Sequence, residues 1–509
     1  MVGPTFVKFC SDLTLALHLK AGRVNGFMMH IYKIDGNTLQ VVCCSPEDIR
    51  KGDYLLINDV VAKRGLIAQV VNTGYANVPG ILGDILREPS TSRVMGKDLD
   101  PLEMRPYVNM IKDAKSFTCK IRRGVIDETL DDDISWVPSR SISRVEKLPD
   151  EKLIKMVGVG QDHSISIGTT KRGAKVSIDI ASIDGKLNII TGKKETGKSH
   201  LSKLLVLGLI SRGGICVVFD VNGEYVNLGY TSDGEKGPFY DKIIVLSPGE
   251  NFKVTLKYAG LNVLLSVMSS VLDLPTTSAW EFRRVWQYLL KSGMLSLREL
   301  GEAIRSVKNN YVQDALLRRY ESLVATGFFT DYAEDAITLE DVLKKIKKGG
   351  VLVFNLQNLP PTFRRIIVEF LLNKFSQLLR RWVIRAIFLF AEEAHLYLRE
   401  TYWDDVVTRM RHLGVFTTFV TNQPDSIREG VYRQADNIFL FNFTNENDLD
   451  IVSRATRVDV ETVRVIACEL PPHHCLMLGK AVKDFPLIVK VNPIDAKTMG
   501  QTRLFFTNL

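Results

Sequence analysis

The apolar residues of the first 150 positions fall in short runs separated by turns. Three such runs are 39–43, 53–57 and 66–71; Gly36-Asn37 precedes the first, and Gly52 and Gly65 precede the other two. Runs of this length between turn residues are typical of strands in a small barrel or sandwich. We therefore expect an all-β barrel over residues 1–150. The charged stretch from Arg144 to Lys155, which carries Pro149, indicates a linker, and we place the linker at 151–160.

After residue 160 the pattern changes to apolar strands followed by helical stretches. The expected strands are 187–191, 215–219, 351–355, 386–391 and 416–421, and the expected helices include 199–209 and 362–382. This alternation predicts an α/β domain with a parallel sheet covered by helices on both faces.

Between residues 255 and 348 the apolar positions recur at helical spacing with few strand signals. We expect a helical insertion there. It divides the α/β domain into a first part, 161–254, and a second part, 349–490, with a tail at 491–509.

Composition narrows the class of protein. The 66 Lys and Arg residues exceed the 58 Asp and Glu residues by eight, and 45% of the chain is hydrophobic. Such values are typical of folded soluble proteins and exclude a disulfide miniprotein or a collagen-like chain. The seven cysteines form no C-x-x-C pair, and no apolar stretch reaches the roughly 18 residues of a membrane span. We expect a cytoplasmic protein without a membrane contact.

One glycine-rich segment carries a strong chemical signal. Residues 192–199 read G-K-K-E-T-G-K-S, which fits G-x-x-x-x-G-K-[ST] directly after an apolar strand. In such a loop backbone N–H groups wrap a polyphosphate, the lysine reaches the β and γ oxygens, and the serine ligates Mg²⁺. The alternative, an ordinary turn, is disfavoured by the position between a strand and a helix. The candidate residues for binding ATP are Gly192, Lys193, Lys194, Glu195, Thr196, Gly197, Lys198, Ser199 and the adjacent His200.

Two carboxylates follow the expected strand 386–391. Glu392 and Glu393 lie where parallel sheets bind ligands, at the carboxyl end of a strand. One carboxylate can hold Mg²⁺ through water and the other can polarise the attacking water of a phosphoryl transfer. We assign Glu392, with Ser199, to the metal and Glu393 to the base.

These motifs and three further segments resemble the HerA branch of the HerA and FtsK family of hexameric DNA-translocating ATPases. The further segments are D-V-N-G-E-Y at 220–225, E-E-A-H at 392–395 and R-H-L-G at 411–414. The resemblance spans nearly the whole chain. It implies a P-loop ATPase domain of the RecA-like type preceded by a small β-barrel.

The resemblance implies roles for residues outside the two motifs. Asp220 is expected to orient the nucleophilic water or the metal shell. Arg411 is similar to the nucleotide-sensing arginine of the family, because a guanidinium suits the charge of a transferring phosphoryl group. Taken alone, Arg409 and Arg411 are better explained as surface arginines.

The chain departs from the family pattern at three places. Glu195 stands where the family usually has a glycine, so an acid lies close to bound phosphate. The strand after Arg411 usually ends in a phosphate-sensing Gln, whereas this chain has Asn422 followed by Gln423, and either amide could act. Lys186 replaces an arginine that often reaches a neighbouring subunit's nucleotide, and we rank it as a weak trans-acting candidate.

Two functions are compatible with these residues. The first is a homo-hexameric, Mg²⁺- and ATP-dependent DNA translocase or helicase that processes DNA ends with a nuclease of the NurA type, docked on the N-terminal barrel. The second is a nucleotide-gated scaffold that assembles with a partner effector, as defence-type relatives of the family do. A secretion or conjugation ATPase is disfavoured by the lack of an apolar anchor. Basic pairs such as Arg380-Arg381 could contact DNA or simply face solvent.

Overall fold

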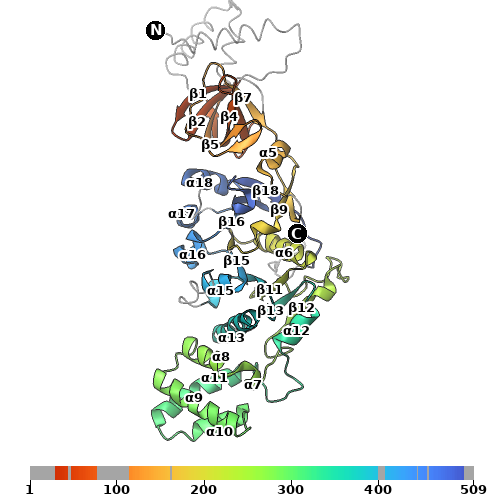
Figure 1. Cartoon of the computed structure of the whole chain (residues 1–509), viewed down its shortest axis with the longest axis vertical. Coiled ribbons are helices and arrows are strands. Elements are labelled where there is room, and N and C mark those ends of the chain that lie inside the picture. Colours follow the sequence, from red (N-terminus) through yellow and green to blue (C-terminus); the bar gives the residue numbers. More distant parts are fainter. Residues whose placement is uncertain are drawn as a thin grey trace, which may run out of the picture. The chain divides into compact units, whose positions relative to one another are not determined.

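The computed structural model describes residues 29–43, 48–76, 114–160, 163–398, 407–443, 445–454 and 458–497. Residues 1–28 of the expected barrel and 498–509 of the expected tail lie outside this set. The chain divides into two compact units, Met1–Gly158 and Val159–Leu509, which are coloured along the sequence in Figure 1.

The first unit contains a closed antiparallel barrel. Its sheet order β2-β1-β7-β3-β4-β5-β6, with a further pairing of β2 and β5, joins six strands into a ring and leaves β6 as an addition to β5. Side chains of alternating positions, such as Leu39, Val41 and Cys43 in β2, fill the interior. The all-β barrel expected from the sequence is confirmed. The strands are β1 (Met29–Asp35), β2 (Thr38–Cys43), β3 (Tyr54–Asp59), β4 (Arg64–Tyr75), β5 (Lys115–Ile126), β6 (Thr129–Asp131) and β7 (Arg144–Leu148).

The segment expected to be a linker is ordered structure. Residues Arg144–Leu148 form β7, which pairs with β3 and β1, and Asp150–Val157 form helix α5 within the first unit. The charged residues of this helix face solvent, while Leu153 and Val157 are buried. Gly158, in the left-handed conformation at φ 65°, ends the helix. Charge density and Pro149 therefore marked an amphipathic helix and its start.

The second unit is built on an eleven-stranded sheet of order β12-β13-β11-β14-β15-β10-β16-β17-β18-β8-β9. Every pairing from β12 to β16 is parallel, and the core strands are apolar along their length, as expected. The strands are β8 (Ser164–Thr169), β9 (Lys175–Asp179), β10 (Asn188–Thr191), β11 (Ile215–Asp220), β12 (Ile243–Leu246), β13 (Gly350–Asn355), β14 (Ile387–Glu392), β15 (Val415–Thr421), β16 (Asn437–Leu440), β17 (His474–Gly479) and β18 (Leu487–Val491).

The sheet is mixed, whereas the sequence predicted an all-parallel one. The pairings β16–β17, β17–β18, β18–β8 and β8–β9 are antiparallel. Two of these pairings, β17–β18 and β8–β9, are hairpins that need no crossover helix, so the strand-helix alternation that revealed the parallel part is absent between these strands. Strand β9 also alternates buried and exposed positions, which is typical of an edge with one solvated face.

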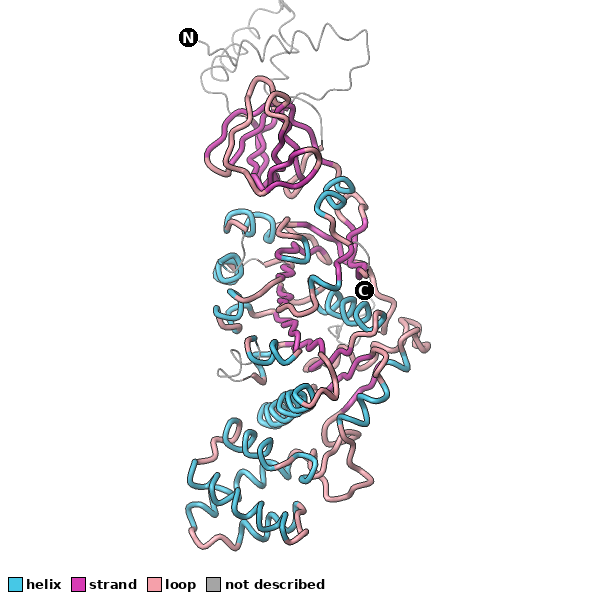
Figure 2. Tube along the Cα trace, in the orientation of Figure 1, coloured by secondary structure: helices cyan, strands magenta, loops and turns pink. Residues whose placement is uncertain are grey.

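Helices cover both faces of this sheet, as Figure 2 shows. The principal ones are α6 (Lys198–Ser211), α12 (Leu339–Lys345), α13 (Pro361–Arg380), α15 (Arg409–Leu413), α16 (Glu429–Arg433), α17 (Glu446–Arg454) and α18 (Val460–Cys468). Helix α13 is buried along much of its length and joins the sheet to the helical insertion. Among the described helices, none combines the length and the apolar character that a membrane span requires.

Between β12 and α12 the chain forms five helices. They are α7 (Leu256–Ala259), α8 (Leu261–Ser270), α9 (Thr276–Lys291), α10 (Leu297–Arg305) and α11 (Asn310–Ala325). Their buried residues, such as Phe282 and Trp286, belong to the same continuous core as the sheet. The insertion is thus an extension of the second unit.

Candidate active site

The glycine-rich loop joins the carboxyl end of β10 to the first turn of α6. A Cβ atom on Gly192 would lie 2.4 Å from the Cβ of Phe441, so a side chain does not fit there. Gly197 has φ 112°, a conformation that favours glycine. The threonine hydroxyl of Thr196 donates to the carbonyl of Lys193 at 2.7 Å, and Lys193 N–H donates to Asn442. These residues therefore form a tight loop that leads into the N-terminus of α6, where backbone N–H groups can bind an anion.

Lys198 is the buried cation of this loop. Its ammonium donates to the Lys193 carbonyl at 2.6 Å. Burial lowers the pKa of Lys198 to about 8, although the charges of Glu393, Glu224 and Glu392 act in the opposite direction. A bound anion would raise the pKa of this lysine again, because the negative charge stabilises the protonated ammonium.

The two carboxylates after β14 have different environments. Glu392 is 2% exposed, and neither of its carboxylate oxygens has a hydrogen-bond partner among the described residues. Burial, together with the charges of Glu224 and Asp220, raises the pKa of Glu392 well above its usual value. Glu393 has the left-handed φ of 43°, and its Oε2 accepts a bond from Thr421 Oγ1 at 3.1 Å. The strained backbone aims the second carboxylate at the end of β15.

Asp220, predicted to act on water or metal, has both oxygens occupied by the turn that follows β11. Oδ1 accepts the N–H of Glu224 at 3.0 Å and Oδ2 accepts the N–H of Tyr225 at 2.8 Å. The side chain is fully buried, and this burial raises its pKa. The Tyr225 hydroxyl in turn donates to Ser202 on α6. Asp220 therefore fixes the turn that presents Glu224.

Glu224 is the carboxylate that sequence reasoning did not select. It forms an ion pair of 3.5 Å with Lys203, a buried residue one turn after Ser199 on α6. The D-x-x-G-E-Y segment was visible in the sequence, but the first acid was chosen over the second because it ends the strand.

The predicted residues meet around a cavity of about 540 Å³ at the carboxyl edge of the sheet. Those that line it are Lys194, Glu195, Lys198, Ser199, Glu392, Glu393, Asn422 and Gln423. Both alternative amides thus face the cavity. It is also lined by residues that the sequence did not single out: Asn222, Glu224, His395, Leu396 and Val420.

His200, predicted to bind the cofactor, is directed elsewhere. Its Nε2 accepts the N–H of Ile494 at 2.9 Å, and its ring lies edge-on to His473 with 6.1 Å between centroids. Burial lowers the pKa of His200, so the ring favours the neutral form that can accept this bond. It anchors the C-terminal segment to α6 and does not line the cavity.

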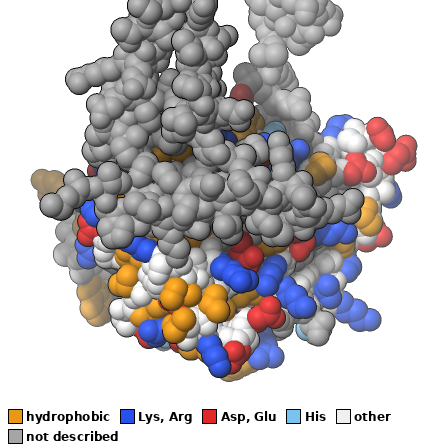
Figure 3. Space-filling view, turned by 90° about the horizontal axis from the view of Figure 1, so that it is seen from above, with side chains coloured by type: hydrophobic (Ala, Val, Ile, Leu, Met, Phe, Trp, Pro, Cys, Tyr) orange, Lys and Arg blue, Asp and Glu red, His pale blue; other side chains and the backbone are white. Residues whose placement is uncertain are grey.

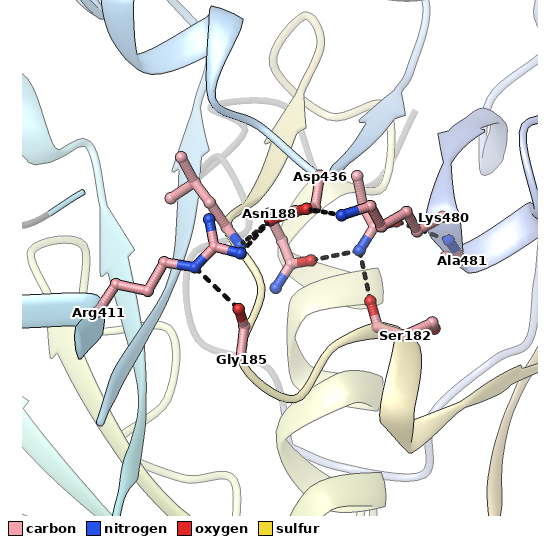
Figure 4. Close-up of polar contacts among 9 residues, drawn as sticks. Ser182, Gly185, Asn188, Arg411, Asp436, Lys480 and Ala481 are labelled. Atoms are coloured by element: carbon pink, nitrogen blue, oxygen red, sulfur yellow. Dashed lines mark hydrogen bonds and ion pairs between the residues drawn. The ribbon is translucent and has the colours of Figure 1, made fainter. Parts of the chain in front are cut away.

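Arg411 and Lys186 lie at the opposite, amino edge of the sheet. Figure 4 shows Arg411 donating through Nε to the Gly185 carbonyl at 2.9 Å and pairing with Asp436 at 2.9 Å. The other oxygen of Asp436 accepts Lys480 Nζ at 2.6 Å. Burial opposes ionisation of Asp436, yet these cations and the Leu187 N–H lower its pKa below the usual value.

This network fixes the turn that precedes β10. Asn437 adds to it by donating to the Ser182 carbonyl and to Asn188, both at 2.8 Å. Arg411 and Lys186 do not line the cavity of their own chain: they precede β15 and β10, whereas the cavity lies at the carboxyl ends of these strands. The two cations therefore do not belong to the same intrachain site as Lys198.

Comparison with known proteins bears on this site. Residues 165–375 match the family described as "Helicase HerA, central domain". A DNA double-strand break repair helicase HerA from Saccharolobus solfataricus is 22% identical over 72% of this chain and 75% of its own length. A protein of the same name from Pyrococcus furiosus is 22% identical over 70% of this chain and 74% of its own.

Among solved structures, a bacterial conjugative coupling protein, TrwBdeltaN70, has a TM-score of 0.50 at 15% identity. The match covers 68% of this chain and 92% of that protein. It shows a shared P-loop ATPase fold, in agreement with the fold class expected from the sequence.

Proposed function

Because the chain belongs to the HerA family of ATP-hydrolysing enzymes, we propose that it is a ring-forming motor that uses ATP to move DNA. The observation that carries this proposal is the cavity in which Lys198, Ser199 and the two glutamates after β14 meet. The combination of a phosphate loop, a buried acid and a second acid beside a polar strand end suits phosphoryl transfer to water.

The residues of the cavity fit ATP and Mg²⁺. The Ser199 hydroxyl and the Glu392 carboxylate offer oxygen atoms of the kind that Mg²⁺ prefers, and the buried Glu392 oxygens have no other partner among the described residues. Mg²⁺ held by these two residues would neutralise part of the phosphate charge during hydrolysis. Ionised Glu392 is costly in this buried site, so a cation there stabilises its charged form.

The remaining residues have separable roles in hydrolysis. Lys198 and the loop N–H groups hold the β and γ phosphate oxygens. Glu393, oriented by Thr421, accepts the proton of the water that attacks the γ-phosphorus while the bond to the β–γ bridging oxygen breaks. Asn422 and Gln423 offer amide N–H groups to the same phosphate. Asp220 acts through Glu224, whose position it fixes.

Assembly into a homo-hexamer would explain the cations at the amino edge. In a head-to-tail ring, one edge of each sheet faces a different surface of the next subunit. We propose that Lys186 and Arg411 act there on the nucleotide of a neighbour, and that Asp436 holds Arg411 until the neighbour is in place. The separate barrel unit is the proposed docking site of a NurA-type nuclease.

Steady-state ATP hydrolysis, measured with and without linear duplex DNA at low salt, tests the motor. Lys198→Ala serves as the blank. A severalfold DNA stimulation that disappears in Lys198→Ala supports the proposal. Lys198-dependent hydrolysis that is unaffected by DNA at every salt concentration contradicts it.

A second function, the nucleotide-gated scaffold, is favoured by Glu195. This acid lines the cavity and has φ 63°, so both its charge and its backbone are unfavourable for a fast phosphate-binding loop. Slow turnover would suit a protein whose nucleotide state controls assembly with an effector. An ATP-dependent change of oligomeric mass without DNA stimulation would favour the scaffold over the motor.

A further inference from the structure

The turn between α13 and β14 is basic and carries an exposed tryptophan. Residues 380–385 read R-R-W-V-I-R. Ile384 is buried at 8% exposure and ties the turn to the core. The remaining side chains, from Arg380 to Val383 and Arg385, are exposed, and Trp382 is 79% exposed.

The backbone of this turn is a fixed helix end. Trp382 N–H donates to the Leu379 carbonyl at 3.0 Å, and Val383 N–H donates to the Leu378 carbonyl at 3.0 Å. This pair of bonds is the Schellman pattern, in which the residue at the position of Trp382 takes the left-handed conformation. Its φ is 56°.

Glycine is the residue that such a position favours, because a side chain strains the left-handed backbone. Trp382 bears that strain although most of its surface remains in solvent. The fold would be served better by glycine. An exposed aromatic ring at a strained position is therefore better explained by binding than by folding.

The charges around the ring point to the same conclusion. None of the described residues forms an ion pair with Arg380, Arg381 or Arg385. Some other exposed arginines of the second unit do have carboxylate partners, as Arg318 has in Asp314 at 2.8 Å. On the face seen in Figure 3, acidic and basic side chains are likewise interspersed. Three guanidinium groups without an ion-pair partner among the described residues, beside one exposed ring, are complementary to a chain of phosphates that carries flat bases.

We propose that the turn 380–385 binds single-stranded DNA, with a base stacked on Trp382 and the backbone phosphates on the three arginines. The inference rests on the proposed function as a DNA motor and names residues that would contact the DNA. Stacking requires an unpaired base, and the arginines need no particular sequence, so the contact is selective for single strands and tolerant of base identity.

Binding of the full-length chain to a fluorescent single-stranded oligonucleotide, titrated against salt, tests the proposal. Trp382→Gly should weaken binding about tenfold, the loss of one stacked base, with a melting temperature equal to or above that of the parent. Replacing Arg380, Arg381 and Arg385 by Ala should lower the slope of log affinity against log salt by about 2.

Two matched variants control for the chemistry of the residues removed. Trp280→Ala removes another exposed tryptophan, 71% exposed on α9, and Arg318→Ala removes a paired arginine. Both should leave the affinity unchanged. Duplex DNA should respond to the arginine variants but not to Trp382→Gly, because its bases are already stacked.

Failure of this inference differs from failure of the motor. If the parent binds single strands and Trp382→Gly binds them equally well, the turn is not the contact, and the motor stands. If the arginine variants change the oligomeric mass but not the affinity, the turn is a subunit interface and the inference is wrong. If the parent binds no DNA at all, both proposals are contradicted.

Discussion

Replacing Asp220 by Asn tests whether this acid acts on water directly or through Glu224. Two backbone N–H groups now donate to its two oxygens, at 3.0 and 2.8 Å. Asparagine keeps one acceptor and turns the other atom into a donor. Each hydrogen bond to a buried carboxylate contributes about 1.5 to 3 kcal/mol, so one lost bond costs about 2 kcal/mol.

Part of this cost is offset, because the variant no longer buries the carboxylate charge whose desolvation raises the pKa of Asp220. We therefore expect the free energy of unfolding to fall by about 1 to 2 kcal/mol and the melting temperature by about 3 °C. Displacement of Glu224 by a fraction of an ångström should lower kcat by about tenfold.

The assays are thermal unfolding and steady-state ATP hydrolysis of Asp220→Asn, Glu224→Gln and the double variant. If Asp220 acts through Glu224, the double variant hydrolyses ATP no more slowly than Glu224→Gln alone. Asp331→Asn is the matched control, because Asp331 accepts the N–H groups of Leu297 and Arg298 in the same manner in the helical insertion. Losses of kcat that multiply in the double variant, with an unchanged melting temperature, would refute the reasoning.

Three further substitutions or conditions probe the cavity. Glu393→Gln should bind ATP within about threefold of the parent and lose at least about a thousandfold in turnover, measured by phosphate release; retained turnover would move the base to Glu392. Glu195→Gly should raise the free energy of unfolding by about 1 kcal/mol, because φ 63° suits glycine, and should also tighten ATP binding severalfold. Glu195→Gln should tighten ATP binding without the gain in stability. Calorimetry that finds neither gain in Glu195→Gly would contradict this. Because the pKa of Lys198 is about 8 and bound phosphate raises it, ATP affinity should fall as pH rises through 8, and ATP binding should take up a proton in that range. Calorimetry in buffers of different ionisation heat measures this proton uptake. The absence of proton uptake would contradict the role assigned to Lys198.

The sequence predicted the part of the fold that repeats a strong local pattern. Strands β10, β11, β13, β14 and β15 are continuous apolar runs, and their predicted bounds agree with the structure to within one residue at most ends. Strands β8, β9, β12, β16, β17 and β18 were not predicted; in β8, β9 and β18 exposed positions interrupt the apolar run, so these segments resemble loops. Helix α13 was predicted to include Trp382 but ends at Arg380, since a tryptophan at the glycine position of the cap leaves no stop signal in the sequence.

The site was predictable where its residues belong to one motif. Lys198, Ser199 and Glu393 line the cavity as expected from the loop and the strand end. The placement of Arg411 was not predictable, because it depends on Asp436, which is distant in sequence and reaches it only across the amino edge of the folded sheet.

The most direct test of the central claim is displacement of a labelled third strand from linear duplex DNA by the purified protein in the presence of ATP and Mg²⁺. The account predicts displacement that requires ATP and disappears in both Lys198→Ala and Glu393→Gln. Lys198-dependent ATP hydrolysis with no displacement at any salt concentration would contradict it and favour the nucleotide-gated scaffold.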